Sequence, residues 1–302
     1  GKKPFSATLS TTNDIDILSL VPAPPGHLIS GKVSGTLEAS GSLESIIVNG
    51  GIILNNGEYS YRQYGLELKN IESKISAHGD KITFDEIKAK DVFSNQVNGS
   101  GSFSMQNDMP FNIALTTEKF NLINTPYIHG EIKGNIDLTG NDQKAAAKGK
   151  FALGPLEIKI PEHFQQDIPA LTIIKNINEN QNNKEIDNIP YELTLDITLK
   201  TDDKVFIRGW GVDALLGGKL HVTGPSYDPI INGLLRIERG KYQEFGKLLN
   251  IKGGALIFDG PISPSPYMNI VATATEGSTD ISLILAGSIQ SPDITIESIP
   301  AM

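Results

Sequence analysis

The chain has 302 residues, of which 39% are hydrophobic, 7% aromatic and 20% charged, with 30 Gly and 17 Pro. This composition suits many short strands and turns, and it excludes a collagen-like or globally disordered chain. The net charge of −9 argues against nucleic acid as a partner, and the absence of cysteine excludes disulfides, thiolate nucleophiles and cysteine-ligated zinc. No apolar run approaches the roughly 18 residues of a membrane span.

The sequence is dominated by alternation of apolar and polar residues. Residues 1–28 are expected to form an N-terminal strand and a Pro-rich connector. From Ile29 to Leu43 every odd position is apolar or Gly and every even one is Ser, Lys, Thr or Glu, which predicts a strand with one wet face. The same period returns at 128–138, 193–199 and shorter stretches up to 294–296. We therefore expect about 14 to 18 strands, in a β segment over 29–160 and a second one over 191–302.

Residues 161–190 interrupt this pattern. Residues 178–185 are rich in Asn and Gln and have no apolar face, which favours a loop or disorder. The region 161–190 is predicted to be a polar linker or insertion, with room for a short strand at 171–174 or a helical turn at 162–167.

Several strand and turn markers recur at one constant offset. Two glycine-punctuated segments align, and the shared markers are Gly41, Gly50, Gly57 and Tyr59 with Gly224, Gly233, Gly240 and Tyr242. Residues 136–140 and 283–287 end strands in the same way. We interpret this as an internal repeat. Its apolar face needs a second sheet, closure into a barrel, or curling around a groove, and the many glycines inside strands favour a curled sheet.

No catalytic or metal-binding pattern is present. The five histidines are scattered singly, without metal-ligand spacing, and are predicted to be surface residues: His27, His78, His129, His163 and His221. Residues 209–214 satisfy the letters of a dinucleotide-binding motif, but a further strand at 220–222 leaves no room for the crossover helix. We expect no enzyme activity and no cofactor.

The C-terminal third resembles the TamB family, the inner-membrane-anchored subunit of the translocation and assembly module. The family's Arg-Gly-x-Gly-Leu-x-Ala-Glu-Leu-x-Gly run falls on 208–218, with Val212 replacing the usual Leu and Leu215 standing where Glu is common. The segments 233–242, 245–246 and 254–260 with Pro264 look like the family's next blocks, and 287–292 followed by 298–302 resembles its closing strands. Residues 30–160 resemble the wider AsmA-like superfamily more loosely.

This resemblance implies an all-β fold, a long antiparallel sheet curled into a taco-like half-barrel with an apolar groove. It further implies an excised C-terminal portion of a periplasmic protein of the Gram-negative envelope, anchored in the inner membrane when full-length. Such proteins are grouped with bridge-like lipid-transfer proteins, and some pair with an outer-membrane Omp85-type barrel protein.

The leading functional expectation is transport of phospholipid between the inner and outer membranes, with acyl chains on the apolar side of the sheet. The alternative is a periplasmic scaffold or chaperone for outer-membrane protein assembly, in which a sheet edge pairs with client strands. A more distant alternative is a secreted β-solenoid with a dry core. The residues expected to line the lipid groove are Val33, Leu37, Ile132, Ile136, Leu193, Leu195, Ile197, Leu199, Leu216, Leu220, Val222, Leu235, Ile237, Leu283, Leu285, Ile294 and Ile296.

Overall fold

The computed structural model describes residues 5–16, 27–42, 45–61, 65–106, 108–160, 192–201, 205–209, 211–244, 246–261, 266–288 and 291–300. These residues form 17 strands and contain no helix, and therefore no helix that could cross a membrane. The strands are β1 (Phe5–Asp16), β2 (His27–Ser42), β3 (Ser45–Tyr61), β4 (Leu66–His78), β5 (Lys81–Lys90), β6 (Gln96–Ser104), β7 (Phe111–Asn124), β8 (Ile128–Gly140), β9 (Lys144–Lys159), β10 (Glu192–Thr201), β11 (Val205–Gly209), β12 (Val212–Pro225), β13 (Ile230–Glu244), β14 (Lys247–Pro261), β15 (Tyr267–Glu276), β16 (Thr279–Ser288) and β17 (Ser291–Ile299).

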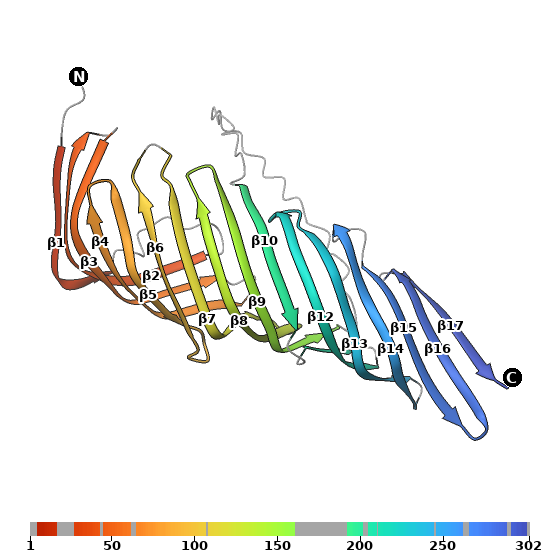
Figure 1. The fold of residues 1–302 in the computed structure, drawn as a ribbon. Helices are drawn as coiled ribbons and strands as arrows, with labels where there is room; N and C mark the ends of the chain where they lie inside the picture. The colour runs from red at the N-terminus through yellow and green to blue at the C-terminus, as the bar shows by residue number, and fades with distance from the viewer. Residues whose placement is uncertain are drawn as a thin grey trace, which may run out of the picture.

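All the strands belong to one sheet. Consecutive strands pair antiparallel from β1 to β9 and again from β12 to β17. Figure 1 shows them succeeding one another along a curved sheet, with β1 and β17 at opposite ends. The all-β curled sheet expected from the sequence is confirmed. The predicted segments 29–160 and 191–302 join within it, and the predicted linker 161–190 lies outside the described residues.

The sheet departs from the expected antiparallel pattern at one junction. Strands β10 and β11 share one position, where both run parallel to β9 and both pair antiparallel with β12. Parallel neighbours need a connection that carries the chain back along the strand, and a hairpin turn cannot provide one. The 32 residues between β9 and β10, 160–191, make that connection, so the sheet is mixed.

The register places all the apolar residues of the alternating pattern on one face. Directly opposed residues share a face, so rows of partners can be traced across the sheet. One row contains only apolar residues and Gly: Leu115, Ile136, Gly149, Ile197, Val222 and Ile231. The next row, on the opposite face, contains only polar ones: Thr116, Asn135, Lys150, Thr198, His221 and Asn232. We call these two surfaces the groove face and the outer face.

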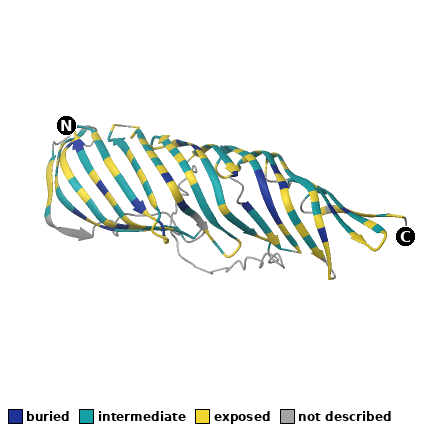
Figure 2. Cartoon of the chain, turned by 60° about the horizontal axis from the view of Figure 1, so that its bottom comes forward, coloured by how far each residue is buried: buried dark blue, intermediate teal, exposed yellow. Residues whose placement is uncertain are grey.

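Burial shows that the groove face is the concave one. Polar Ser73 and Thr117 lie on the groove face and are only 6% and 8% exposed, whereas Ile53 and Ile257 on the outer face are 46% and 41% exposed. At these four positions burial follows the face and not the polarity of the residue. In Figure 2 intermediate and exposed positions alternate along the strands. A single bent layer produces this pattern because side chains converge on its inner side.

The repeat seen in the sequence is a repeat of hairpin register. Leu37 lies opposite Gly50 in β2–β3, and the repeat-related Leu220 lies opposite Gly233 in β12–β13. Ile136 pairs with Gly149 in β8–β9 at the same sequence separation. A repeated register keeps the groove face of successive hairpins in line.

Adjacent glycines in β14 provide a test of the curvature. A Cβ added to Gly254, on the groove face, would lie 3.0 Å from Ile270 Cγ1 and 2.9 Å from the Asn269 carbonyl oxygen. A Cβ added to Gly253, on the outer face, would meet nothing within 4 Å. We expect Gly254→Val to lower the free energy of unfolding by about 1–3 kcal/mol through overpacking. Gly253→Val should leave the free energy of unfolding nearly unchanged. Urea denaturation of both variants provides the measurement, and an equal loss of stability in the two would contradict the assignment of the groove face as the crowded side.

Candidate functional site

All 17 residues predicted to line the groove lie on the groove face. Their cross-strand partners are apolar residues or Gly in nearly every case, for example Val33 with Leu54 and Leu199 with Leu220. Five of them are buried: Val33, Leu216, Leu235, Ile237 and Leu283. Ten are half-buried, and Ile294 and Ile296 on β17 are exposed. The 17 residues therefore share one face of the sheet, and their role as a lipid lining stays a prediction.

The groove face is most tightly packed around β11, β12 and β13. Val205, Ala214 and Leu216 form a buried cluster there with Leu235 and Ile237. Half-buried residues from β9, β14 and β15 pack on this cluster, among them Leu153, Leu256 and Ile270. Because side chains from β9 to β15 gather over β11–β13, the apolar surface is continuous across the parallel junction.

The groove becomes more open toward the C-terminal edge. Ile294 and Ile296 are 63% and 66% exposed, although they pair with Leu285 and Leu283 on the same apolar face. Within the described residues β17 pairs only with β16, so one side of each groove residue on β17 has no neighbouring strand. The apolar face is therefore least covered at this end of the sheet.

Several groove residues were not predicted because bulges break the alternation. Phe84 and Ile87 both lie on the groove face of β5 although they are three positions apart, and the register shifts between them. Phe120 is buried on the groove face of β7, again next to shifts in register. A bulge adds a residue to one strand and reverses its parity, so a strict period of two assigns the residues beyond the bulge to the wrong face. Aromatic residues next to apolar partners were the available signal.

A short hairpin narrows one rim of the sheet. Strand β5 ends at Lys90 and strand β6 begins at Gln96, whereas the neighbouring strands β4 and β7 extend beyond this hairpin turn. In a flat sheet β4 and β7 would be roughly 14 Å apart. Instead Gly65, just before β4, lies against the backbone of Asn124 at the end of β7, so closely that a Cβ would overlap it. Because β4 and β7 approach each other at one rim, the sheet is curved there.

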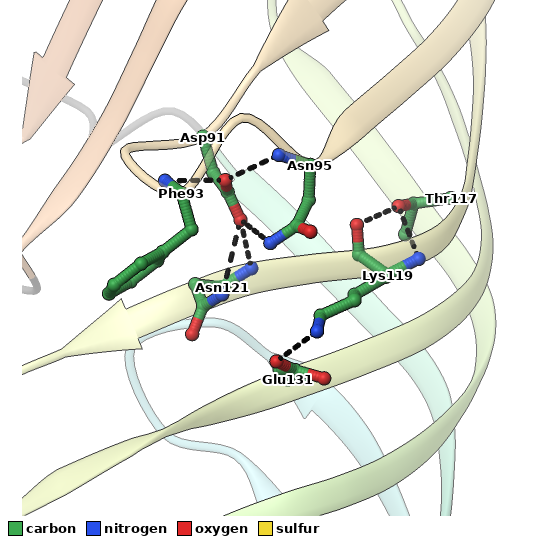
Figure 3. Close-up of polar contacts among 7 residues, drawn as sticks. All are labelled: Asp91, Phe93, Asn95, Thr117, Lys119, Asn121 and Glu131. Carbon is green, nitrogen blue, oxygen red and sulfur yellow. Dashed lines mark hydrogen bonds and ion pairs between the residues drawn. The ribbon is translucent and has the colours of Figure 1, made fainter.

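Asp91 lies in the turn between β5 and β6, and its side chain binds the neighbouring strand β7. Its carboxylate is 3% exposed and accepts five hydrogen bonds, two from Asn121 on β7 and three from within the turn (Figure 3). The donors are Phe93 N at 2.9 Å, Asn95 N at 2.9 Å, Asn95 Nδ2 at 2.8 Å, Asn121 N at 2.8 Å and Asn121 Nδ2 at 3.2 Å. The turn of the short hairpin is thereby fastened to the long strand beside it.

Thr117 and Lys119, which are also drawn in Figure 3, hold the same part of β7. The Thr117 hydroxyl lies 2.9 Å from the carbonyl oxygens of both Gln96 and Lys119, where the register of β7 shifts. Lys119 Nζ lies 2.8 Å from Glu131 Oε1 on β8. These contacts join β6, β7 and β8 beside the Asp91 turn.

The outer face carries the ion pairs. Arg208 on β11 donates to Glu157 on β9 at 2.9 Å and to Asp213 on β12 at 3.2 Å, which spans the parallel junction. Hydrogen bonding to Arg208 lowers the pKa of Glu157. His129 and His221 each contact a carboxylate on this face, as expected of surface histidines. No group of His, Asp and Glu suited to a metal ion occurs in the described residues.

The outer face is also hollowed in two places. A depression of about 490 Å³ lies over β5 to β8, and its polar lining includes Lys81, Thr83, Asp85, Ser102 and Asp137. Another of about 420 Å³ lies over β2 to β4 and is lined in part by Ser30, Glu58 and Lys69. Both are open, and each is lined by a mixture of polar and apolar residues.

Comparison with known proteins agrees with this architecture. The family described as the TamB C-terminal domain matches residues 84–302, which is more than two thirds of the chain. The chain belongs to the TamB family. The match begins within β5 and extends through the parallel junction to the C-terminal edge, so TamB-type sequence covers most of the groove.

A curated relative extends this match further toward the N-terminus. The chain is similar to the translocation and assembly module subunit TamB of Haemophilus influenzae, with 21% identity over 291 residues. The alignment covers 91% of this chain but only 22% of that protein. The chain therefore spans about a fifth of the length of this TamB relative.

The Asp91 contacts give a prediction with a defined pH dependence. Burial alone would raise the pKa of Asp91, but the hydrogen bonds from Asn95 and Asn121 outweigh it and the pKa falls below its ordinary value of 3.8. A lowered pKa in the folded state stabilises the fold above the unfolded value, and this stabilisation is lost as the pH falls through the folded one. Asp91→Asn should cost about 1–3 kcal/mol at neutral pH, because some donors lose their acceptor.

The difference in free energy of unfolding between the parent and Asp91→Asn should then shrink as the pH is lowered through and below 3.8. Chemical denaturation across this pH range provides the measurement. Asp137→Asn is the matched control, since Asp137 is exposed on the outer face. An Asp91 variant as stable as this control at neutral pH would contradict the role given to the carboxylate.

Proposed function

We propose that this chain carries phospholipid between the inner and outer membranes along its apolar groove. The observation that carries the proposal is the continuous apolar face that extends from β2 to β17 and is not covered by a second layer among the described residues. With β10 and β11 sharing one position, the strands span roughly 70 Å along the groove at ~4.8 Å per strand.

The chemistry of the groove suits a mobile lipid. Acyl chains on this face are stabilised by ~0.8 kcal/mol for each CH₂ removed from water. The apolar rows offer similar aliphatic surfaces along the sheet, so a chain bound at one strand finds an equivalent surface at the next. Polar headgroups would remain at the wet rims. The closed, dry core of a β-solenoid does not fit a sheet whose Ile294 and Ile296 are largely exposed.

The family supplies the setting of this function. The relative is named as a subunit of the translocation and assembly module. Family membership supports a place in the periplasm of a Gram-negative envelope, within a longer protein anchored in the inner membrane, with an outer-membrane Omp85-type barrel as partner.

A scaffold for outer-membrane protein assembly is the second candidate, and the C-terminal edge favours it. An edge strand presents unpaired backbone groups, and β17 adds exposed Ile294 and Ile296 on one face. A client strand added there would extend the sheet. A photo-crosslinker at Thr295 should capture unfolded barrel clients if this edge accepts strands, whereas one at Thr194 inside the sheet should not.

Charge introduced at adjacent positions tests the conduit. Leu195 lies half-buried on the groove face and Thr194 is exposed on the outer face of the same strand. We expect Leu195→Asp to fold but to reduce co-purifying lipid by more than about tenfold, because a carboxylate in the apolar row disfavours acyl chains. Thr194→Asp should retain the lipid content of the parent. Mass spectrometry of bound lipid provides the measurement, and equal lipid in both variants would rule out the groove as the lipid site.

A further inference from the structure

The outer face contains one row that differs from those beside it. Lys200, Lys219, Leu234, Ile257 and Tyr267 pair successively across β10, β12, β13, β14 and β15. Along these five strands the row has two cations on one side, an aromatic residue on the other and no acidic residue, and it continues into Ala152 on β9 and Ser288 on β16. We call it the basic–apolar row.

The basic half gathers positive charge on a chain whose net charge is −9. Lys200 and Lys219 lie directly opposite each other, an arrangement that destabilises a sheet. Neither Lys forms an ion pair within the described residues. Lys150 and Arg236 lie in the rows on either side, and Lys133 lies two strands further along the same row, paired with Glu118.

Among the described residues, the acidic groups near the row lie beside it and not in it. Asp196 is paired with His221, and Asp259 lies in the adjacent row. The Glu238 side chain lies over Gly217, next to Arg236. These groups leave the two opposed lysines exposed as the charged end of the row.

The apolar half is exposed on the face that is otherwise polar. Ile257 is 41% and Tyr267 56% exposed, and Leu234 beside them is half-buried. Tyrosine combines an apolar ring with a hydroxyl and suits a boundary between water and an apolar phase. Lysines beside aliphatic and aromatic side chains are the combination found at the surface of anionic membranes.

The geometry of the row selects a flat partner. Rows of cross-strand partners run along the groove, and the outer side of the curled sheet is convex. The convex side of a curled sheet touches a plane along a line parallel to the groove. Across five strands this line is roughly 19 Å long. The two depressions described above lie over other strands.

We propose that the basic–apolar row docks the outer face of this chain on the surface of an anionic lipid bilayer. Lys200 and Lys219 lie against the lipid phosphates, and Ile257 and Tyr267 enter the headgroup region. An acidic protein is the competing partner, but a straight line of contact along a convex face fits a flat bilayer better. The site is separate from the groove, which lies on the opposite face.

Vesicle co-sedimentation tests the proposal in the Leu195→Asp background, where lipid uptake by the groove no longer contributes. The 302-residue chain should bind vesicles of phosphatidylglycerol mixed with phosphatidylcholine, bind vesicles of phosphatidylcholine alone much more weakly, and be released by salt. Neutralising both lysines, Lys200→Gln with Lys219→Gln, should weaken binding about 30-fold, from ~1 kcal/mol per Lys near an anionic surface. Tyr267→Ser should weaken binding while retaining its salt dependence.

The matched control is Lys74→Gln with Lys81→Gln, which removes the same charge from exposed outer-face positions at the other end of the sheet. This control should bind like its parent. Equal weakening by both lysine pairs, no binding of anionic vesicles, or capture of acidic proteins in place of vesicles would overturn the proposal. Lipid content measures the groove and vesicle sedimentation measures the row. The two proposals can therefore fail independently, and the failure of one does not affect the test of the other.

Discussion

The structure depends on one constraint, an amphipathic sheet with no second layer among the described residues to cover its apolar side. A flat sheet of this kind would leave every groove residue in water. Curling brings the side chains of one face together, so that Val33, Leu216 and even polar Ser73 become buried on a single layer. The curvature therefore performs part of the task that a second sheet performs in a sandwich. The part of the apolar face that stays uncovered is the surface available to an apolar cargo.

The face of each strand could be predicted from the sequence because strand periodicity is local. Leu193, Leu195 and Ile197 alternate with polar residues, and pairing with neighbours cannot change which side they face. The parallel junction could not be predicted, since pairing of β9 with β10 depends on where a long connection returns the chain. Asp91 and Asn121 were also missed: they are 30 positions apart, and their contact exists only because a hairpin between them is short.

Bulges and the short hairpin account for the bending that alternation alone does not specify. Register shifts occur in β2–β3, β3–β4, β4–β5, β5–β6, β7–β8 and β8–β9, which form the more strongly curved half of the sheet in Figure 1. Bulges bend and twist a strand locally. In the C-terminal part shifts are fewer, at Leu215 and Ile251, and the end of the sheet is more open. The N-terminal half of the sheet is thus the more strongly curved, whereas the tightest side-chain packing of the groove face lies around β11–β13.

The two proposals together constrain how the sheet is oriented. The basic–apolar row runs along the groove, so docking it on a bilayer would place the groove axis parallel to the membrane surface, with the opening turned away from it. Lipid could not then leave sideways across the row, because the sheet itself separates the groove from the bilayer. Exit would have to take place at an end, and the exposed Ile294 and Ile296 put the least covered apolar surface at β17.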